Sequence, residues 1–333
     1  MSLDFRPLWT LAGLTWLLLP QAAGQTLSID TTLTGPSLVQ QFLLGNGILL
    51  GEVTGTGAGS QCGAFTSGTA LGFEDGILLG SGQVTDLLPN GSSTYLPYTA
   101  ISTDDDLLAV AQSVPDLIGQ GFYISGVYDA VSLAFDFIPL GDSLAFEFVF
   151  ASEEYPNWVN TSFNDVFAFF ISGPGISGPY ANGAQNIAVV PGSNPALPIT
   201  ISSVNAQLNS DYFVPVTFPS TEFSASVGGY TVPLTASVAG LQVGATYHIR
   251  LAIADGSDTA LNSYVLLRSG SFTSVLTVAP GSTGDFDGDG QVDVQDLLIF
   301  TANFGCTGNC VADIDGDGST DIADLLAFLV LFQ

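Results

Sequence analysis

The chain has 333 residues, of which 31 are acidic and only three are basic, so its formal net charge is -28 with the single histidine neutral. Lysine is absent, and the basic residues are Arg6, Arg250 and Arg268. Nucleic-acid binding is disfavoured because a protein needs a basic face to neutralise phosphates. Enzymes that clamp phosphate or carboxylate substrates with Lys or Arg are disfavoured for a similar reason. A hydrophobic fraction of 47% argues against disorder, since such a chain can bury a large core.

The first 24 residues have the pattern of a secretory signal peptide. Arg6 precedes an apolar run from Leu8 to Leu19, and the small residues Ala22 and Gly24 then prepare a cut before Gln25. The run is too short for a membrane-spanning helix, and no later run reaches the necessary length. We predict an extracellular protein, secreted or attached to the cell surface, with no membrane span after cleavage. A retained N-terminal anchor is the alternative.

Cysteine usage agrees with export. Cys306 and Cys310 flank a short turn and predict a local disulfide in an oxidising compartment. Cys62 is then left over, either as a free thiol or for an intermolecular bond.

Residues 25–278 have a β pattern throughout. Short runs rich in Val, Ile, Phe, Tyr and Thr alternate with clusters of Gly, Pro, Asn and Ser. In the run from Leu144 to Phe150, the even-numbered residues Leu144, Phe146, Phe148 and Phe150 share one face by the period of two. The pattern predicts a mainly β protein with a jelly-roll-like β-sandwich. Helices are predicted at 37–44 and 105–117, and residues 279–284 have the composition of a linker.

Two acidic loops of twelve residues follow this linker, and each is followed by an apolar segment. Carboxylates stand at loop positions 1, 3, 5, 9 and 12, and glycine stands at position 6. This spacing wraps the chain around one Ca²⁺, with position 7 giving its backbone carbonyl. The predicted ligands of the first ion are Asp285, Asp287, Asp289, Gln291, Asp293 and Asp296. Those of the second are Asp313, Asp315, Asp317, Ser319, Asp321 and Asp324.

Residues 285–333 resemble the type I dockerin module, because a loop–helix pair occurs twice with Asp at position 12 and no helix precedes the first loop. The resemblance implies two Ca²⁺ ions, one packed pair of helices and docking to a cohesin-like partner. The pairs before position 12, Val294-Gln295 and Ile322-Ala323, are more apolar than the Ser/Thr pair common in dockerins. Another cell-surface protein is therefore an alternative partner.

Five segments of the β-domain stand out by their sequence: 76–82 (GILLGSG), 148–156 (FVFASEEYP), 163–175 (FNDVFAFFISGPG), 186–192 (NIAVVPG) and 247–255 (YHIRLAIAD). Together they resemble the choice-of-anchor L domain family. They occur in the expected order over residues 30 to 275. The resemblance implies a secreted or surface-attached bacterial protein whose C-terminal module serves anchoring or sorting.

Acidic residues at strand ends suggest a third Ca²⁺ site. Glu154 follows one predicted strand, Asp165 precedes the next, and Asp255 ends a third, so we predict that their carboxylates converge on one ion. Separate solvated loop acids are one alternative. A glycosidase acid–base pair chosen from Glu147, Glu153, Glu154 and Asp165 is another. A Ser–His–Asp hydrolase would need His248, which lies in a strand pattern without a nucleophile elbow.

These observations together predict an exported, calcium-binding protein without enzymatic activity. Its β-sandwich would act as a binding or adhesion module, with a glycan as a candidate ligand, and its dockerin-like tail would anchor or assemble it. The alternative is a component of an extracellular polysaccharide-degrading system with a catalytic β-domain. A structural matrix or surface-layer subunit is the third hypothesis.

Overall fold

The computed structural model describes residues 27–57, 59–89, 103–216, 225–275, 284–286, 290–308 and 310–332. The predicted signal peptide, most of the predicted linker 279–284, and the loop residues Asp287 and Asp289 lie outside the described residues.

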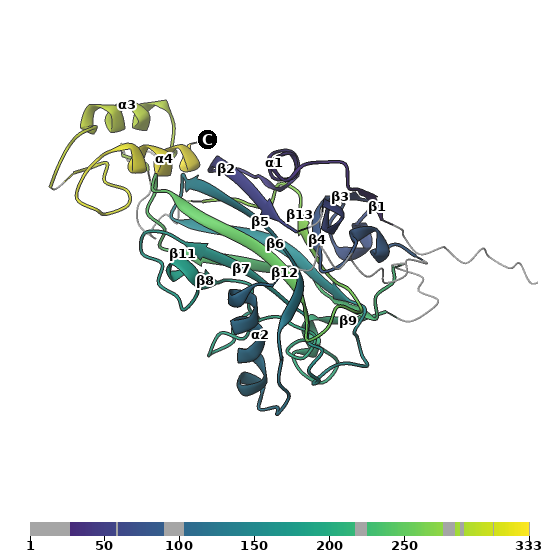
Figure 1. The fold of residues 1–333 in the computed structure, drawn as a ribbon. Coiled ribbons are helices and arrows are strands. Elements are labelled where there is room, and N and C mark those ends of the chain that lie inside the picture. The colour runs from purple at the N-terminus through teal and green to yellow at the C-terminus, as the bar shows by residue number, and fades with distance from the viewer. Residues whose placement is uncertain are drawn as a thin grey trace, which may run out of the picture.

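Two antiparallel β-sheets make up the main domain (Figure 1). The eight-stranded sheet has the order β1-β3-β4-β13-β6-β10-β9, with β11 also paired to β6, and the five-stranded sheet has the order β2-β5-β12-β7-β8. The strands of the first sheet are β1 (Ser28–Asp30), β3 (Cys62–Thr66), β4 (Gly76–Gly80), β13 (Ser263–Arg268), β6 (Ser143–Ser152), β10 (Gly229–Thr231), β9 (Phe213–Pro215) and β11 (Leu234–Ala239). Those of the second are β2 (Ile48–Thr56), β5 (Val127–Pro139), β12 (Tyr247–Gly256), β7 (Val166–Ser172) and β8 (Gln185–Asn186).

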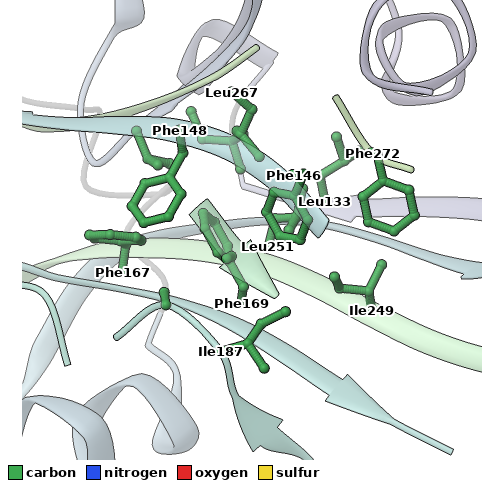
Figure 2. Packing of buried hydrophobic residues seen from close by; sticks show 14 of the residues in the cluster. Leu133, Phe146, Phe148, Phe167, Phe169, Ile187, Ile249, Leu251, Leu267 and Phe272 are labelled. Carbon is green, nitrogen blue, oxygen red and sulfur yellow. The ribbon is translucent and has the colours of Figure 1, made fainter. Parts of the chain in front are cut away.

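The main core lies between the two sheets (Figure 2). Alternate residues of facing strands fill it, as the period of two requires: Leu144, Phe146, Phe148 and Phe150 from β6, and Phe167, Phe169 and Ile171 from β7. The predicted face of β6 is confirmed. Each fully buried Phe contributes about 1.5–3 kcal/mol relative to an exposed one, so this aromatic layer is a main source of the stability of the sandwich.

Helix α2 (Asp105–Ile118) covers the outer face of the five-stranded sheet. Leu107, Val110 and Ala111 pack on Val166, Ala168 and Phe170, which belong to the β7 face opposite the main core. Asp104 caps the helix by accepting a hydrogen bond from the Leu107 amide at 2.9 Å. The Arg250 guanidinium of β12 pairs with Asp104 and Asp106, which fixes the start of the helix on the sheet. The predicted helix 105–117 is therefore confirmed.

The remaining helical segments are short. The predicted helix 37–44 appears as α1 (Gly35–Leu38) followed by a π-helical turn, Val39–Leu43. The tail contains α3 (Val294–Asn303) and α4 (Ile322–Leu331), which lie at one end of the sandwich (Figure 1). Single 3₁₀ turns are found at Gly59–Gln61, Thr69–Leu71, Val84–Leu87, Ala181–Gly183 and Ser210–Tyr212.

Cys62 is a free thiol on β3, half-buried against the main core. Burial raises the pKa of its thiol to about 12, so very little reactive thiolate forms near neutral pH. We expect iodoacetamide at pH 8 to alkylate Cys62 roughly 100-fold or more slowly in the folded chain than in the guanidinium-unfolded chain. Mass spectrometry measures both rates without reductant, and equal rates would contradict this account of the thiol.

Candidate functional site

The tail forms a small core of its own. Phe300 of α3 and Ala327 and Phe328 of α4 are buried, and Phe286 at the start of the first loop packs against them. The Phe328 ring centroid lies 5.8 Å from that of Phe286 and 5.7 Å from that of Phe300. Phe286 thus attaches the start of the first loop to both helices.

The second loop gathers three carboxylates. One oxygen from each of Asp313, Asp315 and Asp317 lies within 4.8 Å of the others, and in the part of the chain that the structure describes this is the only such group of acidic, His or Cys side chains. Ca²⁺ binds oxygens at 2.3–2.6 Å, so ligands on opposite sides of one ion lie up to about 5 Å apart. Positions 1, 3 and 5 of this loop therefore fit a single Ca²⁺.

Both loops turn in the same way at position 6. The Gly318 amide donates to the Asp313 carboxylate at 2.9 Å, and the Gly290 amide donates to the Asp285 carboxylate at the same distance. Both glycines have positive φ, 92° and 89°, where a side chain would be strained. The positive φ explains why glycine stands at this position in both loops. Gln291 at position 7 is exposed, and the Ser319 hydroxyl donates to Asp317 at 2.7 Å.

Position 12 ties each loop to the helix that follows it. The buried Asp324 carboxylate accepts hydrogen bonds from the amides of Ile314, Asp315 and Asp321 at 2.6, 3.1 and 2.9 Å. Asp296 does the same in the first loop, with the amides of Phe286 and Asp293 at 2.6 and 3.0 Å. These bonds fix each loop on the helix that follows it.

Position 9 has a structural task that the sequence prediction did not assign to it. Asp293 and Asp321 are the N-caps of α3 and α4, accepting from the amides of Gln295 and Ala323 at 2.8 Å. With Asp296 and Asp324 at the third helical position, each pair forms a capping box. The spacing Asp-x-x-Asp before an apolar run is the signal that would have predicted it.

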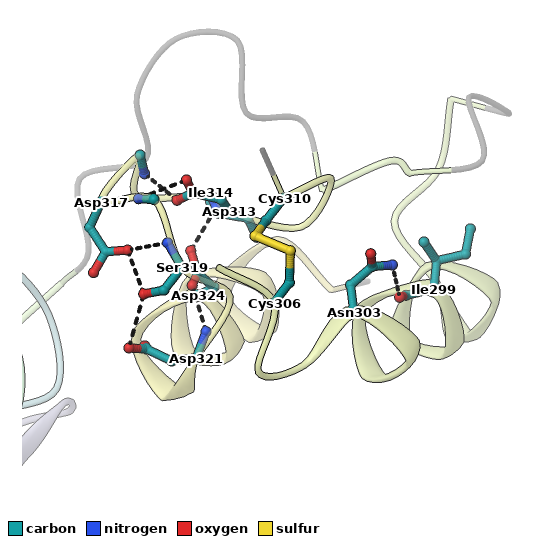
Figure 3. Close-up of a disulfide and its surroundings, with 12 residues drawn as sticks. Ile299, Asn303, Cys306, Cys310, Asp313, Ile314, Asp317, Ser319, Asp321 and Asp324 are labelled. Atoms are coloured by element: carbon teal, nitrogen blue, oxygen red, sulfur yellow. Dashed lines mark hydrogen bonds between the residues drawn. A yellow bond between two sulfur atoms is a disulfide. The ribbon is translucent and has the colours of Figure 1, made fainter. Parts of the chain in front are cut away.

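The disulfide predicted between Cys306 and Cys310 is present (Figure 3). It closes the turn between α3 and the second loop. The same turn pairs with that loop, since the Gly308 amide donates to the Gly318 carbonyl at 2.7 Å and the Thr320 amide donates to the Cys306 carbonyl at 3.0 Å. The disulfide therefore braces the loop that holds the three gathered carboxylates.

The three acids predicted in the β-domain are all in its interior. Glu154, Asp165 and Asp255 are at most 1% exposed, so the alternative of separate solvated loop acids is wrong. The Asp165 amide faces the Glu154 carboxylate at 3.4 Å, and the Asp165 carboxylate accepts from the Gly256 amide at 2.9 Å and the Ser263 hydroxyl at 2.7 Å. The strand ends thus come together as predicted.

Their electrostatics are unfavourable in isolation. Burial, together with the charges of neighbouring acids, raises the pKa of Glu154 and of Asp255 well above the ordinary range. Burial also raises the pKa of Asp165 to about 8, against the lowering effect of its hydrogen bonds. The three carboxylates do not form a group with oxygens within 4.8 Å of one another. They are not arranged here as three direct ligands of one ion.

The residues of the catalytic alternatives lie apart. Glu147 on β6 pairs with Arg268 and lines a pocket of about 390 Å³ in which it is the only acid, while Glu154 and Asp165 are buried elsewhere. The Asn262 amide donates to the Glu153 carboxylate at 3.1 Å. His248 on β12 contacts Asp136 at 2.7 Å, and its neighbour across the sheet is Ser172. Ser172 ends β7 without the strand–turn–helix of a nucleophile elbow.

Two packed antiparallel sheets with a C-terminal pair of acidic loops define a β-sandwich protein with an appended loop–helix module. The chain belongs to the Choice-of-anchor L domain family, whose match covers residues 26–273, well over half of the sequence. The match stops before the acidic loops of the tail. No curated protein and no solved structure shows a significant match to the chain.

Family membership indicates a protein associated with the cell surface, either anchored there or extracellular. Among the described residues, no helix has both the length and the apolar character needed to cross a membrane.

Proposed function

We propose that this chain is a calcium-binding surface protein whose tail, residues 285–333, holds two Ca²⁺ ions and attaches the β-sandwich to a partner. The observation that carries the proposal is the gathering of Asp313, Asp315 and Asp317 within the span of one ion. All donors in the two loops are oxygens, which is the ligand type that Ca²⁺ requires. The shared bond from position 6 to position 1 extends the argument to the first loop.

The tail also offers an apolar surface to a partner. Val294 and Leu298 of α3 and Ile322, Leu329 and Val330 of α4 are each more than half exposed. These apolar side chains are not used in the core of the tail. Clusters of exposed apolar residues often mark sites of contact with another protein. A cohesin-like or other cell-surface protein is the partner class we propose, and calcium would organise both helices for it.

The β-sandwich is proposed to bind rather than to catalyse. Its pocket of about 390 Å³ is lined by Thr235, Ser271 and Thr273 together with the Glu147–Arg268 pair. Hydroxyls and a charged pair suit the hydroxyl groups of a glycan. The alternative, a polysaccharide-degrading enzyme, needs two carboxyl groups across the scissile bond, and this pocket supplies one.

Retention on cells tests the attachment. We expect fluorescently labelled residues 25–333 to remain on the surface of the producing cells in 1 mM Ca²⁺. In chelator the amount of labelled protein retained should fall about tenfold, because the tail needs bound calcium to keep its fold. Leu298→Glu with Ile322→Glu should lower retention similarly while Ca²⁺ binding stays intact. Leu49→Glu is the matched control, because Leu49 is exposed on the β-sandwich. Retention that ignores both chelator and the tail substitutions would refute the proposal.

A further inference from the structure

Four strands of the β-sandwich meet at one end around buried acids. Glu154 follows β6, Asp165 precedes β7, Asp255 lies near the end of β12, and Asp129 lies near the start of β5. Strand register fixes the meeting, because Ala254 of β12 pairs with Val166 of β7. A bulge between β12 and β5 includes Asp129, which has a φ of 52°. We refer to Glu154, Asp165, Asp255 and Asp129 as the buried acid cluster.

Asp255 is the most unusual member of this cluster. Its side chain is fully buried, and neither carboxylate oxygen accepts a hydrogen bond of ordinary distance and angle, although the Ser81 side chain is near enough to lower the pKa of Asp255. Asp129, a residue that is 2% exposed, also has one carboxylate oxygen without a hydrogen-bond partner. More than about nine in ten buried polar groups in folded proteins have a partner, and an exception points to a missing water or ion. The two carboxylate oxygens of Asp255 therefore retain acceptor capacity close to Asp165 and Asp129, whose charges act on it.

Among the residues that the structure describes, each basic side chain is paired away from this cluster. Arg250 pairs with Asp104 and Asp106 of α2, Arg268 pairs with Glu147, and His248 pairs with Asp136. The remaining basic residue, Arg6, belongs to the predicted signal peptide, and the sequence has no lysine. Buried carboxylates without a counter-charge are costly. Compensation must then come from solution, either as a bound cation or as protons on the carboxylates.

We propose that the buried acid cluster binds one divalent cation of the Ca²⁺ class. Asp255 would be a direct ligand through its free oxygens, and at least one other member would act through water, because three of the carboxylates do not fit around one ion directly. The ion would connect the end of β6 in one sheet to β5, β7 and β12 in the other. Its role is structural, and it is independent of the two tail ions.

The test uses residues 25–333 with both tail loops disabled by Asp285→Asn, Asp289→Asn, Asp313→Asn and Asp315→Asn. We expect calorimetry to find one Ca²⁺ per chain in this background. Melting in 1 mM Ca²⁺ should occur about 5–10 °C above melting in chelator, if the ion is present at roughly 100 times its dissociation constant. Trp158 reports the melt, because it is the only tryptophan after residue 24.

Adding Asp255→Asn should remove the ion and reduce the calcium-dependent shift to below about 1 °C. Asp116→Asn changes an exposed acid on α2 and is the matched control. This variant should keep the bound ion and the calcium-dependent shift in melting temperature. If the Asp255→Asn chain does not fold, terbium luminescence of the tail-disabled chain tests the site without this substitution. Trp158 lies beside Glu154, its amide donating to the Glu154 carbonyl at 3.1 Å, and should sensitise terbium that Ca²⁺ then displaces.

Three outcomes would overturn the proposal. The first is that the tail-disabled chain binds no Ca²⁺. The second is that its melting temperature is the same in calcium and in chelator. The third is that bound terbium shows no emission sensitised by Trp158. An Asp255→Asn chain that melts higher than its parent in both conditions would show that the cluster holds protons instead. Because the tail loops are disabled throughout, failure here leaves the proposed tail function untouched.

Discussion

Asp324→Ala should abolish Ca²⁺ binding by the second loop and also loosen the tail in the absence of calcium. The Asp324 carboxylate accepts three backbone hydrogen bonds while fully buried, and its loss leaves those amides without a partner. Each unsatisfied buried group costs about 1–3 kcal/mol. Calorimetry on residues 25–333 should show one Ca²⁺ fewer than the unaltered chain, and circular dichroism in chelator should show less helix.

Asp317→Asn provides the contrast. Asp317 is exposed at position 5, and among the described residues its hydrogen bonds stay within its own loop, to Asp315 and Ser319. We expect this substitution to weaken Ca²⁺ binding while helix content in chelator stays unchanged. If the two variants behaved alike in chelator, the hydrogen bonds of Asp324 would not hold the tail together. If Asp324→Ala kept full affinity, the loop register would be wrong.

At position 9 the sequence predicted the role of Asp293 in calcium binding but not its role at the start of the helix. The calcium-loop pattern gives Asp293 a ligand role through water, which predicts that Asp293→Ala only weakens one site. The structure adds a second role, because Asp293 is the N-cap of α3. Losing an N-cap costs about 0.5–2 kcal/mol of helix stability. We now expect Asp293→Ala to weaken Ca²⁺ binding and to lower helix content in chelator, which circular dichroism measures.

The β pattern predicted the faces of strands but not their neighbours. Alternation along residues 144–150 placed the Phe side chains on one face because that signal is local. The pairing of β6 with β13 on one side and with β10 and β11 on the other joins segments far apart in the sequence. Nothing within a strand encodes such a partner, so the sheet order required the structure.

The buried acid cluster was also predicted only in part from the sequence. Glu154, Asp165 and Asp255 could be grouped in advance because each stands at the end of a β-rich run. Their complete burial was not predicted, since strand ends usually meet solvent. Asp129 was missed, because it enters the cluster through a bulge with left-handed backbone inside β5. A bulge of this kind has no local sequence signal apart from the tolerance of Asp for that conformation.

Phe169→Ala should cause the largest loss of stability in the β-sandwich. Phe169 is fully buried between the sheets, and its ring centroid lies 5.0 Å from those of Phe146 and Phe148 and 5.4 Å from that of Phe167 (Figure 2). Both sheets contribute to this group, so the cavity cannot close without moving one sheet toward the other. We expect a loss of about 3–5 kcal/mol in the free energy of unfolding.

Urea unfolding followed by Trp158 fluorescence measures this loss. Phe169→Leu, which retains part of the volume, should cost clearly less than Phe169→Ala. Leu49→Ala removes an exposed apolar side chain and should stay within about 0.5 kcal/mol of the parent. A Phe169→Ala loss as small as that of Leu49→Ala would mean that the aromatic layer does not join the two sheets. Because Phe169 lies within β7 and Asp165 directly precedes that strand, the Phe169→Ala chain should also bind Ca²⁺ less tightly at the buried acid cluster.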